Sequence, residues 1–239
     1  MIKILACFSL VLLTGFTRAV ELARDGGLSV TNGLELWFDC ANQNTLRRNV
    51  PGLPPLGSGN LVAELLDGSG HDRHLTQLQR SSRPKFRQEL DCSFLAFDGV
   101  DDALAVSDLN KKFPSVTAFI VAAPHSNAGM FPGLFSLSRT GQNDYTSGIN
   151  CDLGPSPTPQ FSFLNVEGAG FGGASQLLKS APLSFGGWHV AAIRCEAGPQ
   201  GVSVFLNGKP QGTRERHQSE IGMDHFTLGS RLYSNTGEP

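Results

Sequence analysis

The chain has 239 residues, enough for one large β-sandwich or two small domains. Its 28 glycines, 14 prolines and charged fraction of 17% suit short strands joined by many turns. Nineteen basic and 21 acidic residues give a net charge of −2, so the chain lacks the basic surface of proteins that bind nucleic acid or anionic membranes.

Residues 1–19 predict a cleaved signal peptide. Lys3 supplies the positive charge, residues 4–16 the apolar run, and Ala19 the small residue at the cleavage site. The apolar run is shorter than the roughly 20 residues that span a bilayer, so we expect no membrane insertion after cleavage. The protein is therefore predicted to be secreted, periplasmic or at the cell surface, with a lead-in at residues 20–33 and one domain at residues 34–239.

The domain is predicted to consist of short strands separated by turns. We expect strands at residues 34–39, 62–66, 75–78, 94–97, 103–106, 115–123, 132–138, 148–153, 160–166, 176–179, 188–195, 201–206 and 226–229. The run 115–123 is nearly all apolar, which predicts a strand buried on both faces. No stretch has helical periodicity over three turns, so the pattern favours an all-β sandwich or barrel.

A double hairpin at residues 188–212 is the clearest local signal. Residues 201–206 alternate, and Asn207-Gly208 then supplies the two residues with positive φ that a tight type I′ turn requires. Pro210 restricts the strand after this turn to a short strand or a sheet edge. We expect both tryptophans, Trp37 and Trp188, to be structural, and Trp188 to anchor the core rather than to serve as a platform for sugar rings.

Four cysteines remain after removal of the leader: Cys40, Cys92, Cys151 and Cys195. In an exported chain they predict two disulfides, for which three connectivities are open. The alternative is four buried free thiols, because a domain of this size does not need covalent staples.

The order of these segments resembles the laminin G-like (LamG-like) jelly roll of the concanavalin A-like lectin and glucanase group. The resemblance covers roughly residues 34–232. Its pieces are the opening strand at residues 34–39, the D-x-S-G turn at 67–72, the F-D-G-x-D-D turn at 97–102, the long strand at 115–123, and the W-H-x-V-A strand with its L-N-G hairpin at 188–208.

The resemblance implies a two-sheet antiparallel jelly-roll sandwich. Such domains close with a further apolar strand after the position of Tyr233, so we expect a domain lacking its last strand, with a sheet edge or core groove left open. The family consists commonly of binding modules for glycans or other proteins. It therefore implies a secreted, non-catalytic module for a glycan or an extracellular protein.

Two alternatives stay open. One is a polysaccharide-active enzyme, a lyase or glycoside hydrolase, because Arg87-Gln88-Glu89-Leu90 partly matches a lyase motif of this fold and places Arg87 and Glu89 in a groove. No strand carries the closely spaced acids that a glucanase of this fold needs. The other alternative is a structural or adhesive surface protein with a protein partner.

Two loops are the candidate ligand site, since function commonly lies on loops held by a rigid sandwich. In residues 141–146, Asn143 and Asp144 offer hydrogen-bonding groups for sugar hydroxyls, and Tyr145 offers a ring face. Asn165 would add an amide from the segment 165–173. The alternative is a turn in which Asn143 and Asp144 bond their own backbone and Tyr145 packs inward.

Calcium is the ion that the sequence favours, because it takes carboxylate and carbonyl oxygens from loops. Asp98, Asp101 and Asp102 are the candidate ligands, with Asn143, Asp144 and Asp152 as a second set. The alternative for residues 98–102 is that the aspartates bond the backbone of a tight turn. No other cofactor is expected.

Overall fold

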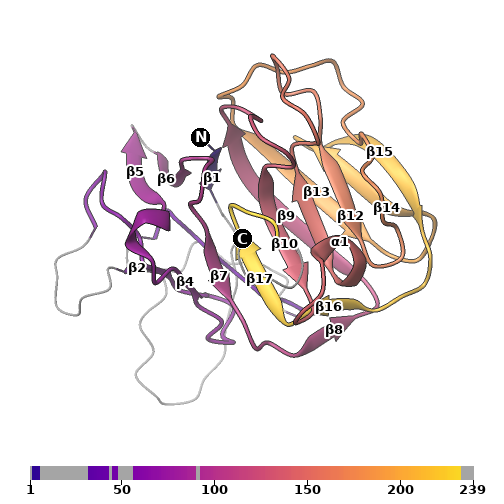
Figure 1. Cartoon of the computed structure of the whole chain (residues 1–239), viewed down its shortest axis with the longest axis horizontal. Coiled ribbons are helices and arrows are strands. Elements are labelled where there is room, and N and C mark those ends of the chain that lie inside the picture. The colour runs from indigo at the N-terminus through magenta and orange to yellow at the C-terminus, as the bar shows by residue number, and fades with distance from the viewer. Residues whose placement is uncertain (1, 6–31, 43–44, 48–55, 90–91, 233–239) are drawn as a thin grey trace.

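The computed structural model describes residues 2–5, 32–42, 45–47, 56–89 and 92–232. Its architecture is all-β, as the sequence predicts, with strands paired antiparallel in several sheets (Figure 1). The helical structure includes the four-residue α1 (Asp144–Ser147) and a 3₁₀ turn at Arg80–Ser82. Among the described residues, no helix has the length and hydrophobicity needed to cross a membrane.

The first sheet has seven antiparallel strands. In spatial order they are β15 (Lys209–Arg216), β14 (Gly198–Leu206), β13 (His189–Cys195), β9 (Val116–Pro124), β1 (Ile2–Leu5), β6 (Cys92–Phe97) and β5 (Lys85–Glu89). The expected double hairpin forms one half of this sheet. Residues 2–5, within the segment predicted to be a signal peptide, form β1, which lies between β9 and β6.

The second sheet has eight strands, several of only two residues. In spatial order they are β12 (Asn165–Gly168), β11 (Ile149–Asp152), β10 (Gly133–Ser138), β17 (His225–Leu228), β7 (Leu104–Val106), β4 (Leu75–Thr76), β3 (Glu64–Leu65) and β2 (Leu46–Arg47). A small third sheet pairs β16 (Ile221–Met223) with β8 (Lys111–Phe113).

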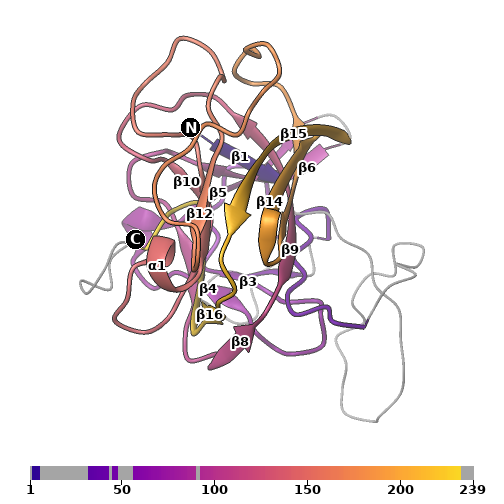
Figure 2. The same cartoon turned by 90° about the vertical axis from the view of Figure 1, so that its right-hand side faces the viewer.

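The two large sheets form the layers of a β-sandwich, with the small sheet at one end (Figure 2). Between them lies one apolar core, to which both layers contribute alternate residues of their strands. Phe226 stacks between Phe38 and Phe135, with ring centroids 5.8 Å and 6.3 Å away. These aromatic contacts join β17, β10 and the segment that opens the domain.

That opening segment, residues 34–39, is not a strand, so this expectation is wrong. Its backbone bonds instead to the turn that begins at Asp67. The Asp67 carboxylate accepts hydrogen bonds from the backbone N–H of Trp37 at 2.9 Å and of Arg73 at 3.2 Å. Arg73 in turn donates to the Glu35 carboxylate at 2.6 Å. Side-chain acceptors thus replace a strand partner for this segment, and Trp37 is buried against the turn.

The tight hairpin joins β14 to β15 through Asn207-Gly208. Both residues have positive φ, 51° and 75°, as a type I′ turn requires. β15 is the edge strand of its sheet, which accommodates Pro210 because a proline has no N–H to donate to a neighbour. β14 begins at Gly198, three residues before the expected strand at residues 201–206.

The outer face of the first sheet is partly exposed, which corrects two expectations. Phe119 in β9 is 48% exposed, so β9 is not buried on both faces. Trp188 is 37% exposed and packs edge-on against Phe94 at 5.3 Å, so it does not anchor the core between the sheets. In a two-layer sandwich only one face of each sheet meets the other, and these rings lie on the opposite face.

The expected disulfides are absent from the described residues, because all four cysteines there are free thiols. Cys40, Cys151 and Cys195 are fully buried and belong to the apolar core, and Cys92 is half-buried. Burial raises the pKa of Cys195 to about 12 and that of Cys151 well above its ordinary value. The alternative of buried free thiols therefore describes three of the four cysteines.

Candidate functional site

The short helix α1 covers the outer face of the second sheet beside β10, β11 and β12 (Figure 2). It connects β10 to β11, and its last turn ends at Gly148. A side chain at Gly148 would clash with the backbone carbonyl of Leu137 in β10, so only glycine lets the helix approach the sheet this closely. The same approach leaves the backbone of Gly148 bonded to Ala169, after β12.

A buried ion pair anchors the start of α1. Asp144 is fully buried, and its two carboxylate oxygens accept hydrogen bonds from Arg231 Nη2 at 2.8 Å and Nε at 3.2 Å. Arg231 follows β17, and its guanidinium lies 5.1 Å from the ring of Phe131 and 5.8 Å from that of Tyr145. This geometry matches the bidentate, stacked pairing that a guanidinium provides and an ammonium does not.

The same arginine reaches a second carboxylate. Its Nη1 lies 2.9 Å from Asp152 Oδ2, and Glu167 Oε1 is 3.9 Å away. Asn165 donates to both of these acids at 2.9 Å. Three acids from α1, β11 and β12 therefore surround one arginine, with the side chains of all four residues less than a tenth exposed.

Burial controls the electrostatics of this cluster. It raises the pKa of Asp152 to about 6, although Arg231 and Asn165 act in the opposite direction. A buried charge is costly unless it is paired and hydrogen-bonded, and here each carboxylate has several donors. The acids are fully engaged and shielded from solvent, so this cluster suits a structural role and is not arranged to contact a substrate.

An open depression of about 730 Å³ lies beside this cluster. It is lined by polar, glycine and aromatic residues of three segments: Tyr145, Thr146, Gly168, Gly170, Phe171, Gly172, Ser175, Arg214, Glu215 and His217. Glu215 and His217 are more than half exposed, and their side chains lie 3.9 Å apart. Gly168 and Gly170 in one wall lie close to the backbone carbonyls of Gly148 and His217, an approach that a side chain at either position would block.

Arg214 fixes the shape of that wall. Its guanidinium donates to the carbonyls of Val166, Gly172 and Gly173 at 2.8 to 3.0 Å. It also lies 5.4 Å from the ring centroid of Phe171. The loop after β12 is thus held by a side chain from β15, in the neighbouring sheet, and the depression is preformed in this structure.

The structure gathers the four predicted ligand residues around one place, but in two different environments. Asp144 and Asn165 lie in the buried cluster and are fully covered. Tyr145 lines the depression, and its hydroxyl bonds Asn143 Nδ2 at 2.8 Å. The alternative of a self-bonding turn is wrong for the two polar residues: Asn143 makes no side-chain cap bond at the start of α1, and the Asp144 carboxylate accepts hydrogen bonds from Arg231. Its other part agrees with the structure, because Tyr145 is half-buried and its ring lies 5.8 Å from the buried Arg231 guanidinium.

Sequence reasoning missed Arg231, Glu167 and Arg214. A search for acids spaced along one strand does not find acids that three separate elements bring together. The signal that was available is the alternation in Asn165-Val166-Glu167, which places both polar residues on the face opposite the core.

The aspartates of the predicted calcium site do lie together. Asp98, Asp101 and Asp102 place carboxylate oxygens within 4.8 Å of one another. Asp98 Oδ1 accepts the backbone N–H groups of Val100, Asp101 and Asp102, and Asp102 Oδ2 accepts that of Asp98. These bonds account for the arrangement as a tight turn, and they use oxygens that a calcium ion would need.

The pKa values of this turn differ between its residues. Burial would raise the pKa of Asp98, but its three backbone donors outweigh that effect and lower it. Burial, together with the nearby charges of Asp98 and Asp101, raises the pKa of Asp102 to about 6. As the pH rises through about 6, Asp102 therefore ionises beside Asp98 and Asp101.

Arg87 and Glu89, which the enzyme alternative needs, both lie in β5, at the edge of the first sheet. β5 pairs along its length with β6.

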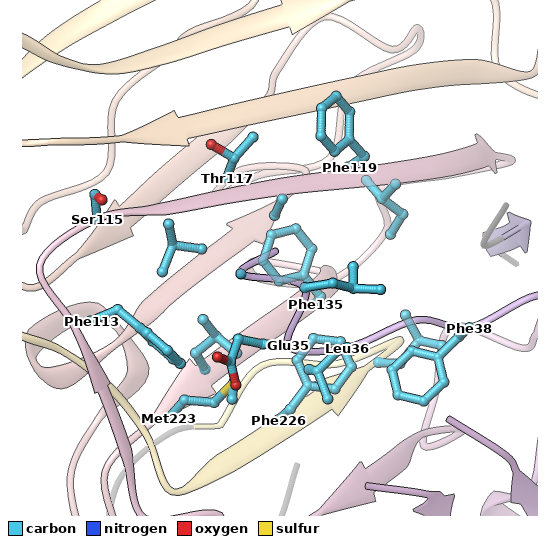
Figure 3. Close-up of a pocket in the computed structure, with 17 residues that line it drawn as sticks. Glu35, Leu36, Phe38, Phe113, Ser115, Thr117, Phe119, Phe135, Met223 and Phe226 are labelled. Atoms are coloured by element: carbon cyan, nitrogen blue, oxygen red, sulfur yellow. The ribbon is translucent and has the colours of Figure 1, made fainter. Parts of the chain in front are cut away.

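A second cavity, of about 370 Å³, is apolar and opens between the two sheets (Figure 3). One wall is the first half of β9, residues 116–120, and the opposite wall is residues 33–36. Its floor is formed by aromatic and aliphatic side chains of the second sheet, Phe135, Leu137, Phe226 and Leu228. Figure 3 shows Phe113 and Met223 closing one end.

Comparison with known proteins gives no relative. No family model, no curated protein and no solved structure matches this chain.

Proposed function

We propose that this protein is an exported, non-catalytic binding module with a LamG-like jelly-roll fold, and that it recognises a glycan in the depression beside α1. The observation that carries the proposal is the convergence of Tyr145, the glycine wall and the Glu215–His217 pair on one preformed, open surface. An aromatic ring with nearby hydrogen-bonding groups is the combination that binds the apolar face and the hydroxyls of a sugar.

The buried cluster supports binding rather than catalysis. Retaining hydrolysis needs two accessible carboxyl groups about 5–5.5 Å apart. Asp144, Asp152 and Glu167 are held by Arg231 and covered, and their role in the proposal is to position α1 and hence Tyr145. The antiparallel two-layer arrangement and the ordered sequence motifs support the jelly-roll assignment.

A glycan array with matched variants tests this proposal. Glu215→Ala/His217→Ala removes the exposed pair at the depression, and we expect at least a tenfold loss of binding. Arg194→Ala/Glu196→Ala removes a similarly exposed pair, 3.9 Å apart, outside the depression, and we expect no change. Equal binding by both variants would move the site elsewhere.

A second measurement addresses the alternatives. Incubation with the polysaccharides that bind should release no new reducing or unsaturated ends, and their appearance would favour the enzyme. Export is tested separately by N-terminal sequencing of protein recovered from a secreting host, which we expect to begin at Val20. If no glycan binds while a surface protein does, the adhesive alternative replaces ours.

A further inference from the structure

The strand β1 occupies an interior position in the first sheet. It pairs with β6 on one side, Ile2 opposite Phe97 and Ile4 opposite Leu95. On the other side it pairs with β9, Ile2 opposite Pro124 and Leu5 opposite Val121. Both neighbouring strands therefore depend on β1 for backbone hydrogen bonds in the middle of the sheet.

This position conflicts with the predicted cleavage after Ala19. Removal of the leader would take β1 away and leave β6 and β9 two strand spacings apart, which is about 10 Å. The flanking residues are fully or nearly fully buried: Leu95 and Phe97 in β6, and Ala122 and Ala123 in β9. Two facing strand edges with buried side chains would then be open to a new strand.

The apolar cavity lies next to the place of β1, further along the same strand β9. β1 pairs antiparallel with the end of β9, so that Ile2 lies opposite Pro124 and Leu5 opposite Val121. The remaining residues of β9, 116–120, form a wall of the cavity. The place of β1 and the cavity are thus successive parts of one channel that follows the nine residues of β9.

We propose that processing of the leader opens this channel as an acceptor for an extended strand donated by another exported polypeptide. This inference rests on the proposed export and cleavage. The donor would add a strand to the edges of β9 and β6 through its backbone, and alternate side chains would enter the core, as in β-strand addition.

The channel specifies the chemistry of the donor. Phe97 and Leu95 are core residues, so the donor positions opposite them must be apolar. Beyond the place of β1, the donor would pass over the cavity floor formed by Phe135, Phe226 and neighbouring aliphatic side chains. Every second residue of the donor there should therefore be large and apolar. The donor residue that takes the place of Lys3 would lie between Ala96 and Ala123, which are both small. The donor positions that alternate with the apolar ones can therefore carry polar side chains such as threonine.

The test uses processed protein that begins at Val20 and a labelled nine-residue peptide of alternating isoleucine and threonine, with terminal lysines for solubility. We expect saturable binding by fluorescence anisotropy and a rise in Tm that grows with peptide concentration. Two control peptides are compared with it. One carries proline at its central residue, which removes a backbone N–H donor, and the other has the same composition with all isoleucines adjacent, which removes the alternation. Each should bind at least tenfold more weakly.

Matched protein variants locate the binding. Ala118→Phe fills the cavity from β9 and should weaken peptide binding at least tenfold. Ala192→Phe makes the same substitution on β13, outside the cavity, and should leave binding unchanged. Equal affinity of both variants would overturn the proposed location.

The other possible outcomes of this experiment also support or overturn the proposed acceptor channel. Processed protein that folds only when the peptide is added supports the acceptor channel, whereas failure to fold with and without it overturns the proposal. Dimers of peptide-free protein would show that a second copy fills the channel. Retention of the leader would refute the proposed cleavage, which N-terminal sequencing detects independently of peptide binding, and glycan binding is scored on the same preparation without peptide.

Discussion

Arg231 is the residue on which the second sheet and α1 most depend. Its guanidinium pairs with Asp144 and Asp152, both fully buried. Removing one partner of a buried ion pair leaves uncompensated charge, which typically costs 3–5 kcal/mol. We therefore expect Arg231→Met to lower the free energy of unfolding by about 3–5 kcal/mol in chemical denaturation.

The matched control for Arg231→Met is Arg80→Met, which removes an exposed guanidinium and should change stability by less than about 0.5 kcal/mol. Arg231→Lys keeps the charge but loses the bidentate geometry, so its stability should fall between the two. A loss below about 1 kcal/mol for Arg231→Met would mean that the acids are protonated and do not need the arginine.

Asp102 gives a pH dependence of definite sign. Its pKa is raised from 3.8 to about 6 in the folded protein, so the folded state retains a proton that the unfolded chain releases. The stabilisation from this proton is complete below about pH 4 and is lost as the pH rises through about 6. Above that pH, ionised Asp102 faces Asp98 and Asp101.

Asp102→Asn should remove this dependence, since the amide oxygen still accepts the Asp98 N–H. We expect the variant to match the wild type near pH 4 and to exceed it at pH 7.5 by on the order of 1 kcal/mol, because the turn borders solvent and screening reduces the effect. Tm measured from pH 4 to 8 reports the difference. A difference that stays constant with pH would contradict the raised pKa of Asp102.

At the scale of elements, the β14–β15 hairpin depends on backbone conformation alone at Gly208. Its φ is 75°, and a Cβ there would meet no atom within 4 Å. Gly208→Val should therefore destabilise by about 1 kcal/mol or more through backbone strain without steric conflict. Gly208→Asn should cost less, because asparagine tolerates this region, and equal costs in denaturant titrations would point to another cause.

Local signals predicted the elements that local chemistry determines. The Asn207-Gly208 turn and the apolar run of β9 were recognisable because turn residues and hydrophobicity specify them directly. The segment 34–39 alternates like a strand but bonds to the side chain of Asp67, a partner 30 residues away. The helix α1 has four residues, too few for any periodicity to be detected.

Of the candidate site, only the loop at residues 141–146 could be predicted from the sequence. Tyr145 was identified because it lies in a polar loop between strands, and it does line the depression. Glu215 and His217 come from a different sheet, and no spacing along the chain relates them to Tyr145. The buried role of Asp144 depends on Arg231, 87 residues later, and such long-range pairing is set by the sheet order.

For the whole molecule, the two sheets are held together by one apolar core and by aromatic stacking across it. Cys151 in the second sheet and Cys195 in the first both belong to that core, as free thiols. The free energy of folding therefore comes from burial of apolar surface and not from covalent links between the layers.

Thiol chemistry tests that statement for the molecule as a whole. Reactivity requires the thiolate, and burial raises the pKa of Cys195 to about 12 and that of Cys151 well above its ordinary value. Cys92 is half-buried, whereas Cys40 is fully covered. In the folded protein after the proposed leader cleavage, we expect Ellman's reagent to modify Cys92 first, with all four thiols reacting in guanidinium. Cys92→Ser should abolish the fast phase and Cys151→Ser should leave it unchanged.

A reductant should not alter Tm, and a reductant-dependent Tm or fewer than four reactive thiols in denaturant would show that the layers are cross-linked after all.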